Sequence, residues 1–247
     1  MTNRFGPLLI FATLVTFAGC GPSSETAPQT PAQRAALDEL RNVRFDAMQS
    51  SLSALDSLSF IERVNLQELS DRDDSTVVIA SHSFTNRLVR GDATVINSAF
   101  AGQVDARSAI DSAGAGELFS RPPLMPFDLP PPFLARRQEH KYRYSKRDTT
   151  IGTRQYDLFI AAGPRDSGEL SRMVVDPETD EVVELIDRRT TSAFLFRADN
   201  VVRIRLAGHD SLRFVQSFDY DLRLKIPFRK ARHFVLRKRY QHESPAA

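Results

Sequence analysis

Apolar residues at the start of the folded region recur at intervals of three and four positions. Such spacing places them on one side of a helix, so residues 36–48 are predicted to form one amphipathic helix. Leu52 and Leu55 extend the same pattern. The folded region is therefore expected to begin near Ala32, with a helix whose apolar positions are Ala36, Leu37, Leu40, Val43, Ala47 and Met48.

From Leu58 onward the apolar period changes to two, which is typical of β-strands with one buried face. Leu58, Phe60, Val64 and Leu66 share one face of the first strand, and Val78, Ala80, Phe84 and Leu88 repeat the alternation in a second. Arg90-Gly91-Asp92 predicts a turn before a strand from Ala93 to Phe100. Further strands are predicted over 138–147, 153–162, 169–176, 181–190, 200–207, 211–226 and 232–241.

The clearest alternation runs from Leu212 to Ile226 and defines the expected fold class. A strand this long, with one apolar and one polar face, indicates a strongly curved antiparallel sheet. We therefore expect an α+β fold that is mainly β, a half-barrel with the amphipathic helix at its N-terminal end. The apolar face of this strand supplies the candidate ligand-binding residues, which are Phe214, Phe218, Tyr220, Leu222 and Leu224.

A proline-rich apolar segment over residues 102–133 interrupts the strands. Proline cannot donate to a strand ladder, so this segment is not a strand interior. Its apolar content favours a connector packed on the sheet, although a cover over a ligand cavity or a loop touching a membrane fits as well. For a cover, the candidate lid residues are Leu124, Met125 and Phe127.

The N-terminal residues are typical of an exported protein. Positive charge at Arg4, an apolar run over residues 8–17 and small residues before Cys20 predict a signal peptide over residues 1–19. Phe17-Ala18-Gly19-Cys20 resembles the lipobox of bacterial lipoproteins, which implies that Cys20 becomes lipidated and forms the new N-terminus. The alternative is a plain secreted protein with a leftover thiol, or a free buried cysteine. Residues 20–31 then form the lipidated cysteine and a flexible tether. In the Gram-negative lipoproteins that this segment resembles, Asp after the cysteine retains the protein in the inner membrane, so the resemblance and Gly21 together imply anchoring to the outer membrane, facing the periplasm.

Composition narrows the chemistry further. The chain has 247 residues and a single cysteine, which excludes an internal disulfide and a multi-cysteine metal site. HExxH, Gly-x-Ser-x-Gly and phosphate-binding glycine motifs are absent from the sequence. The acidic residues near 176–181 form a turn too short for a calcium loop. We predict no enzyme activity, no cofactor and no metal.

Charge is distributed unevenly, although 33 Lys and Arg nearly balance 31 Asp and Glu. Residues 20–120 carry 14 acids and 8 bases, whereas residues 121–247 carry 17 acids and 24 bases. The basic excess is sharpest over residues 222–241, and the candidate basic surface is Arg229, Lys230 and Arg232. Anionic lipid headgroups, lipopolysaccharide phosphates or an acidic partner are possible ligands, and a solvated strand face is the alternative. Export argues against nucleic acid as a partner.

One helix followed by long antiparallel strands resembles the LolA/LolB lipoprotein-carrier superfamily, which includes RseB-like periplasmic sensors. The run Met173-Val174-Val175-Asp176-Pro177-Glu178-Thr179 and the returning strand Val182-Val183-Glu184-Leu185 are similar to a hairpin pattern of that superfamily. The resemblance implies a single half-barrel domain over residues 32–241, with a tail over 242–247 and a helix-lidded cavity for acyl chains. The expected function is an envelope lipoprotein that binds an acyl chain or a lipidated client. The alternative is an envelope scaffold or stress sensor that acts through protein contacts.

Overall fold

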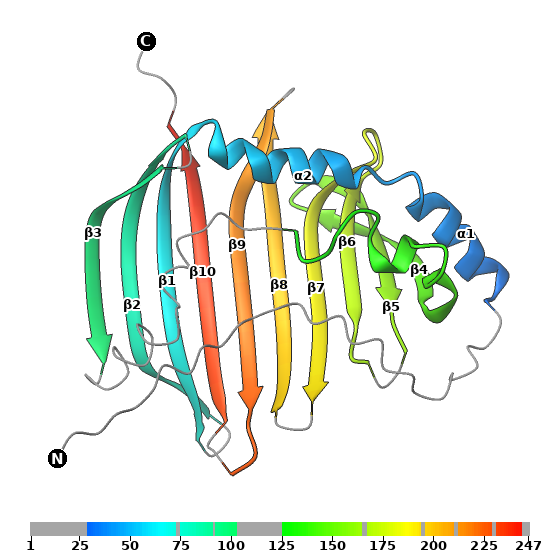
Figure 1. Cartoon of the computed structure of the whole chain (residues 1–247). Coiled ribbons are helices and arrows are strands. Elements are labelled where there is room, and N and C mark those ends of the chain that lie inside the picture. Colours follow the sequence, from blue (N-terminus) through cyan, green and yellow to red (C-terminus); the bar gives the residue numbers. More distant parts are fainter. Residues whose placement is uncertain are drawn as a thin grey trace.

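The computed structural model of the chain describes residues 29–72, 75–90, 92–102, 125–164, 167–193, 196–209, 212–228 and 231–243. These residues form one curved, unclosed antiparallel sheet of ten strands with helices at one end (Figure 1). The predicted fold class is confirmed. The strand order across the sheet is β3-β2-β1-β10-β9-β8-β7-β6-β5-β4. The strands are β1 (Ser59–Arg72), β2 (Ser75–Val89), β3 (Asp92–Gly102), β4 (Arg143–Ile151), β5 (Arg154–Ala162), β6 (Leu170–Asp176), β7 (Glu181–Ala193), β8 (Phe196–His209), β9 (Leu212–Lys225) and β10 (Arg232–His242).

The predicted single helix is wrong, because the segment forms two helices, α1 (Pro31–Leu40) and α2 (Phe45–Ser53). Thr30 begins α1 with a capping box in which its side chain accepts from the backbone N–H of Gln33. The break follows from a tertiary contact, since the backbone N–H of Arg44 donates to the carbonyl of Asp180 at the β6–β7 turn, 2.7 Å away. A continuous helix would have used that N–H internally. A short 3₁₀ turn, η1 (Ala54–Asp56), follows α2.

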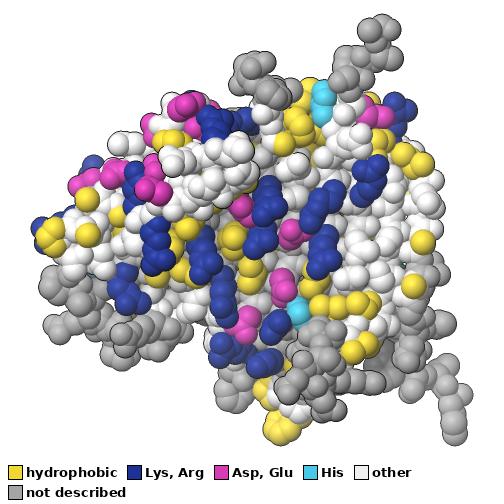
Figure 2. All heavy atoms as spheres, turned by 180° about the vertical axis from the view of Figure 1, so that it is seen from behind, with side chains coloured by type: hydrophobic (Ala, Val, Ile, Leu, Met, Phe, Trp, Pro, Cys, Tyr) yellow, Lys and Arg dark blue, Asp and Glu magenta, His cyan; other side chains and the backbone are white. Residues whose placement is uncertain are grey.

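The two faces of the sheet differ in what covers them. We call the side on which α2 packs the helix face and the opposite side the back face (Figure 1). Backbone pairing places Phe60, Val64 and Leu66 on the helix face, and Arg63 and Asn65 on the back face, as the sequence predicts. Figure 2 shows the back face, where Lys and Arg side chains spread over the central strands.

Two of the four register shifts in the described sheet change the predicted alternation. In β9, Ser217 pairs with Arg205 and Val215 pairs with Leu206, so Gln216 is the unpaired residue. Gln216 is the one polar residue on the otherwise apolar parity of that strand, and the bulge leaves it exposed while Val215 is fully buried. In β2 a second bulge lies between Val78 and Ala80. It moves Val78 off the helix face and leaves it 49% exposed, which corrects its predicted place beside Ala80.

The proline-rich segment belongs to the connection between β3 and β4, which are the two edges of the sheet. This connection therefore joins the two opposite edges of the sheet. Its described part contains two 3₁₀ turns, η2 (Pro132–Leu134) and η3 (Glu139–Lys141). The latter occupies the start of the strand predicted over 138–147, so β4 begins only at Arg143.

The main hydrophobic core lies between the helices and the helix face. Met48 and Leu55 pack over Phe60, Leu185 and Ile204, all of which are fully buried. Side chains thus fill the space beneath α2. We call the connection between β3 and β4 the crossover. Its described part completes this core, because the ring centroid of Phe133 lies 6.0 Å from that of Phe45.

Candidate functional site

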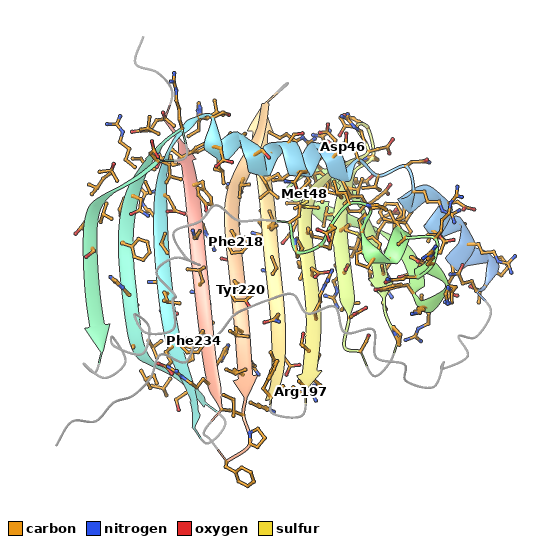
Figure 3. The ribbon with its side chains drawn as sticks, in the orientation of Figure 1. Asp46, Met48, Arg197, Phe218, Tyr220 and Phe234 are labelled. Atoms are coloured by element: carbon orange, nitrogen blue, oxygen red, sulfur yellow. The ribbon has the colours of Figure 1, made fainter. Side chains whose placement is uncertain are left out.

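Beyond α2, the helix face carries a line of partly exposed apolar side chains along β9 and β10. Phe218, Tyr220 and Phe234 step away from α2 toward the far end of the sheet (Figure 3). Leu222 pairs with Phe234, and Leu224 with Arg232. We call this line the apolar track and define it as Phe218, Tyr220, Leu222, Leu224 and Phe234, each of intermediate exposure.

The apolar track rests on a small hydrophobic cluster that is separate from the main core. Val64, Leu66 and Leu236 are buried in this cluster, and Phe218 and Tyr220 pack against it. With a rise of about 3.4 Å per residue, the stretch from Phe218 to Leu224 is roughly 20 Å long. Such a shallow apolar surface matches an extended hydrocarbon chain in shape and polarity.

Phe214, the remaining predicted ligand-binding residue, lies elsewhere. Its ring centroid is 5.7 Å from that of Phe60 and 5.8 Å from that of His242. It therefore packs against the main core beneath the helices. The structure brings Phe218, Tyr220, Leu222 and Leu224 together on one surface and places Phe214 at its covered end.

The far end of the track carries a charged group. Arg232 Nε donates to Glu68 Oε1 at 2.8 Å, and the guanidinium lies 4.6 Å from the centroid of the Phe234 ring. Arg232 therefore belongs to the helix face. Arg229 and Lys230, the other members of the predicted basic surface, lie outside the described residues.

The prediction of one basic surface over residues 222–241 is corrected by the pairing of β9 and β10. Arg232 and Lys238 lie on the helix face, whereas Arg223, Arg237 and Arg239 lie on the back face. A count along the chain pools residues that alternate between two sides of a sheet. The segment's bases thus form two separate groups.

A buried polar cluster separates the track from the core beneath α2. Lys238 Nζ lies 3.0 Å from Glu62 Oε1, and both side chains are at most 2% exposed. The Tyr240 hydroxyl donates to Glu62 at 3.0 Å, and Asn86 Nδ2 donates to Glu62 at 2.7 Å. Burial lowers the pKa of Lys238, and the neighbouring Glu62 opposes this shift. Sequence reasoning missed this cluster, although Glu62 and Lys238 both stand at apolar parity in their strands.

Asp187 is a second buried acid on the helix face, in the same row as Val202 and Tyr220. Its carboxylate accepts a hydrogen bond from Ser171 Oγ at 2.6 Å and one from Arg189 Nε at 2.8 Å. Burial raises the pKa of Asp187, and Arg189 opposes the shift. Among the described residues, Arg189 is the one cationic side chain that forms an ion pair with Asp187.

Asp187→Asn is expected to gain stability relative to the unchanged protein as the pH rises above about 4. Because the folded pKa lies above the ordinary value of 3.8, the stability that Asp187 contributes is fully present below 3.8. It is lost as the pH rises through the folded pKa. Asparagine cannot ionise and avoids this loss. Urea unfolding of both proteins over a pH series measures the difference, and a difference that does not vary with pH would contradict the expectation.

The other predicted positions are divided between the core and the parts of the chain that are not described. Phe127 is 7% exposed, and its ring centroid lies 6.2 Å from that of Phe45 and 5.5 Å from that of Phe133. Met125 packs against the same core. Cys20, Leu124 and the turn glycine Gly91 lie outside the described residues. For the described part of the proline-rich segment, the geometry fits the interpretation as a packed connector.

The back face carries a shallow depression of about 450 Å³. It lies over β1, β2, β3 and β10, on the opposite side of the sheet from the apolar track. Its lining is mostly polar and includes Asn65, Ser83, Thr85 and Asn97, with Arg63, Arg237 and Arg239 at its basic side.

The described residues hold neither a metal-binding cluster nor a membrane-spanning helix. They contain no group of three or more His, Cys, Asp or Glu side chains arranged to hold a metal ion. No helix among them is both long enough and apolar enough to cross a bilayer.

Comparison with known proteins gave likenesses at the level of solved structures. No family model matches the chain, and no curated protein matches it by sequence. The chain is similar to a DUF1329 family protein from Desulfovibrio piger, with 8% identity, 88% of this chain and 96% of that chain covered, and a TM-score of 0.27. It is also similar to a putative outer membrane lipoprotein-sorting protein domain from Vibrio parahaemolyticus, with 9% identity, 86% and 95% coverage, and a TM-score of 0.28.

A third likeness is to the complex of MucA and MucB from Pseudomonas aeruginosa, with 9% identity, 85% of this chain and 100% of that chain covered, and a TM-score of 0.22. All these TM-scores are below 0.5, so no property of these proteins is assigned to this chain.

Proposed function

We propose that this protein is a non-catalytic lipoprotein of the cell envelope, anchored through Cys20, whose apolar track binds the acyl chain of a lipid or of a lipidated client. The observation that supports binding is the track itself, because Phe218, Tyr220, Leu222 and Phe234 remain partly exposed side by side on the helix face. Anchoring at the outer membrane, on the periplasmic side, rests on the lipobox resemblance and on Gly21.

The shape of the track favours a hydrocarbon chain over a compact ligand. It lies on two neighbouring strands and is roughly 20 Å long by the rise of a strand. Each methylene removed from water contributes about 0.8 kcal/mol, so several contacts along its length would hold an acyl chain. At the far end, Arg232 uses Nε for Glu68, and its side chain is 37% exposed, so the guanidinium could also meet an anionic head group.

One observation favours the alternative of an envelope scaffold or sensor acting through protein contacts. The space beneath α2 is filled, since Phe60, Leu185 and Ile204 are fully buried there. The helix-lidded cavity implied by the family resemblance is therefore occupied by the protein's own side chains. A bound chain would lie on the track beyond α2, and a protein lacking bound lipid would act by contact alone.

The distinguishing experiment is extraction of lipid from the purified full chain carrying Cys20→Ala, followed by mass spectrometry. We expect non-covalently bound acyl lipid to co-purify with the protein. Leu222→Glu, added to the same chain, places a charge in the middle of the track and should abolish this lipid. Lys225→Gln is the matched control, because Lys225 is exposed on the back face of the same strand, and it should retain the lipid. No lipid in any sample, or equal loss in both variants, would contradict acyl binding at the track.

A further inference from the structure

The back face of five neighbouring strands carries an array of arginines that the helix face does not share. β6, β7, β8, β9 and β10 are consecutive in the sheet, and each contributes at least one exposed arginine to that side. Figure 2 shows these strands as a field of Lys and Arg side chains with few acids between them. We call the set the basic array and define it as Arg172, Arg188, Arg203, Arg223 and Arg237.

The carboxylates on the same face are already engaged by other partners. Glu184 lies 3.0 Å from Arg205, Asp219 lies 2.6 Å from Arg239, and Asp199 lies 3.4 Å from Arg197. Asp221 accepts from the ring of His233 at 3.0 Å. Among the described residues, Arg172, Arg188, Arg223 and Arg237 have no carboxylate within ion-pair distance, and Arg203 has only Glu184 at 3.5 Å. Four of the five arginines of the basic array therefore have no ion-pair partner among the described residues.

Aliphatic side chains lie beside some of these arginines on neighbouring strands. One row of paired residues runs Arg172, Ile186, Arg203, Asp219 and Arg237. In the neighbouring row Arg188 lies beside Val201. Guanidinium groups interspersed with half-buried aliphatic residues suit an interface where phosphate and hydrocarbon meet, whereas a highly solvated polyanion would gain little from the aliphatic positions.

The extent of the basic array points to a surface as its partner. Neighbouring strands lie about 4.8 Å apart, so the array spans roughly 19 Å from β6 to β10. A single helix is about 10–12 Å wide and an extended peptide is narrower, so either would cover only part of the array. Arg172, Arg203 and Arg237 lie in one row across the sheet, and Arg188 and Arg223 lie in the next two rows, so the array has width as well as length.

We propose that the basic array docks the domain on an anionic membrane surface, with the arginines meeting lipid phosphates. This orientation turns the helix face and the apolar track away from the bilayer. The proposal does not depend on acyl binding at the track, because the two surfaces lie on opposite sides of the sheet.

The test measures co-sedimentation of the full chain carrying Cys20→Ala with vesicles of phosphatidylcholine alone or with an equal part of phosphatidylglycerol. We expect more protein to sediment with the anionic vesicles than with vesicles of phosphatidylcholine alone. Added salt should weaken this additional binding. Each basic residue at an anionic surface strengthens binding by roughly fivefold. Substituting glutamine for Arg172, Arg188, Arg223 and Arg237 should therefore weaken it at least about tenfold.

The matched control removes the same charge from residues outside the back face. Arg34, Arg136, Arg137 and Lys141 are exposed on α1 and the crossover, and their replacement by glutamine should leave vesicle binding within about twofold. Equal weakening by both sets would overturn the proposal, because it would show an effect of net charge alone. Binding to soluble polyglutamate without preference for anionic vesicles would also overturn it and would indicate an acidic protein as the partner.

Discussion

Phe133→Ala is expected to lower the free energy of unfolding by about 3–5 kcal/mol. Phe133 is 1% exposed, and its ring packs edge-on against the rings of Phe45, Phe127 and Tyr142. Its backbone carbonyl also accepts a hydrogen bond from the Tyr144 hydroxyl. Removing the ring leaves a cavity where the crossover, α2 and the sheet meet, and such cavities collapse only in part.

This substitution decides whether the described part of the crossover is core or cover. Urea unfolding of the full chain measures the loss, and Leu129→Ala is the control, because Leu129 lies on the same segment at 43% exposure. We expect the control to change stability by less than about 1 kcal/mol. A similarly small effect of Phe133→Ala would mean that the segment is a detachable lid, as the sequence also allows.

Lys238→Met is expected to destabilise the protein by about 3 kcal/mol, although it replaces a charged side chain with an apolar one of similar length. The substitution leaves Glu62 buried without its cationic partner, and a buried charge that has lost its partner is costly. Hydrogen bonds from Tyr240 and Asn86 remain but supply no counter-charge.

Two further variants isolate this effect. Lys225→Met removes a lysine from an exposed position on β9 and should change stability by no more than about 0.5 kcal/mol. Adding Glu62→Gln to Lys238→Met removes the unpaired charge and should restore a large part of the loss, as measured by urea unfolding. If the double variant were less stable than Lys238→Met, the ion pair would not be the source of the effect.

The strands could be predicted from the sequence because the sheet has two unlike faces. Alternation in β9 identified Phe218, Tyr220 and Leu222 as neighbours on one side, and the register confirms that placement. Gln216 breaks the alternation, and the structure shows a bulge there. In a long strand with one buried face, the apolar residues lie on the buried face and the polar residues on the other. The sequence of the strand therefore predicts the face of each residue.

Contacts between distant parts of the chain carried no such signal. The break between α1 and α2 depends on the contact of Arg44 with Asp180, which lie far apart in the sequence. Likewise, β1 and β10 are the first and last strands along the chain, yet they pair with each other. This pairing makes β3 and β4 the edges of the sheet. Because β3 and β4 lie at opposite edges, the proline-rich connection between them must be long.

The apolar part of the candidate site was predictable, and its charged part was not. Residues 222–241 are rich in bases, but the alternation of the strands divides these bases between the two faces. On the helix face, Lys238 forms a buried ion pair with Glu62, and Arg232 pairs with Glu68, whereas Arg223 and Arg237 lie on the back face. The basic array becomes visible only when five strands are placed side by side, because each strand supplies a single arginine to it.

Photo-crosslinking with a fatty acid that carries a diazirine on its hydrocarbon chain tests acyl binding at the apolar track most directly. After irradiation of the full chain carrying Cys20→Ala, peptide mass spectrometry locates the attached probe. We predict adducts on the β9 and β10 peptides that contain Tyr220, Leu222 and Phe234, and their loss when unlabelled fatty acid competes. Adducts confined to the back face or to other elements, or adducts that unlabelled fatty acid does not displace, would contradict the account.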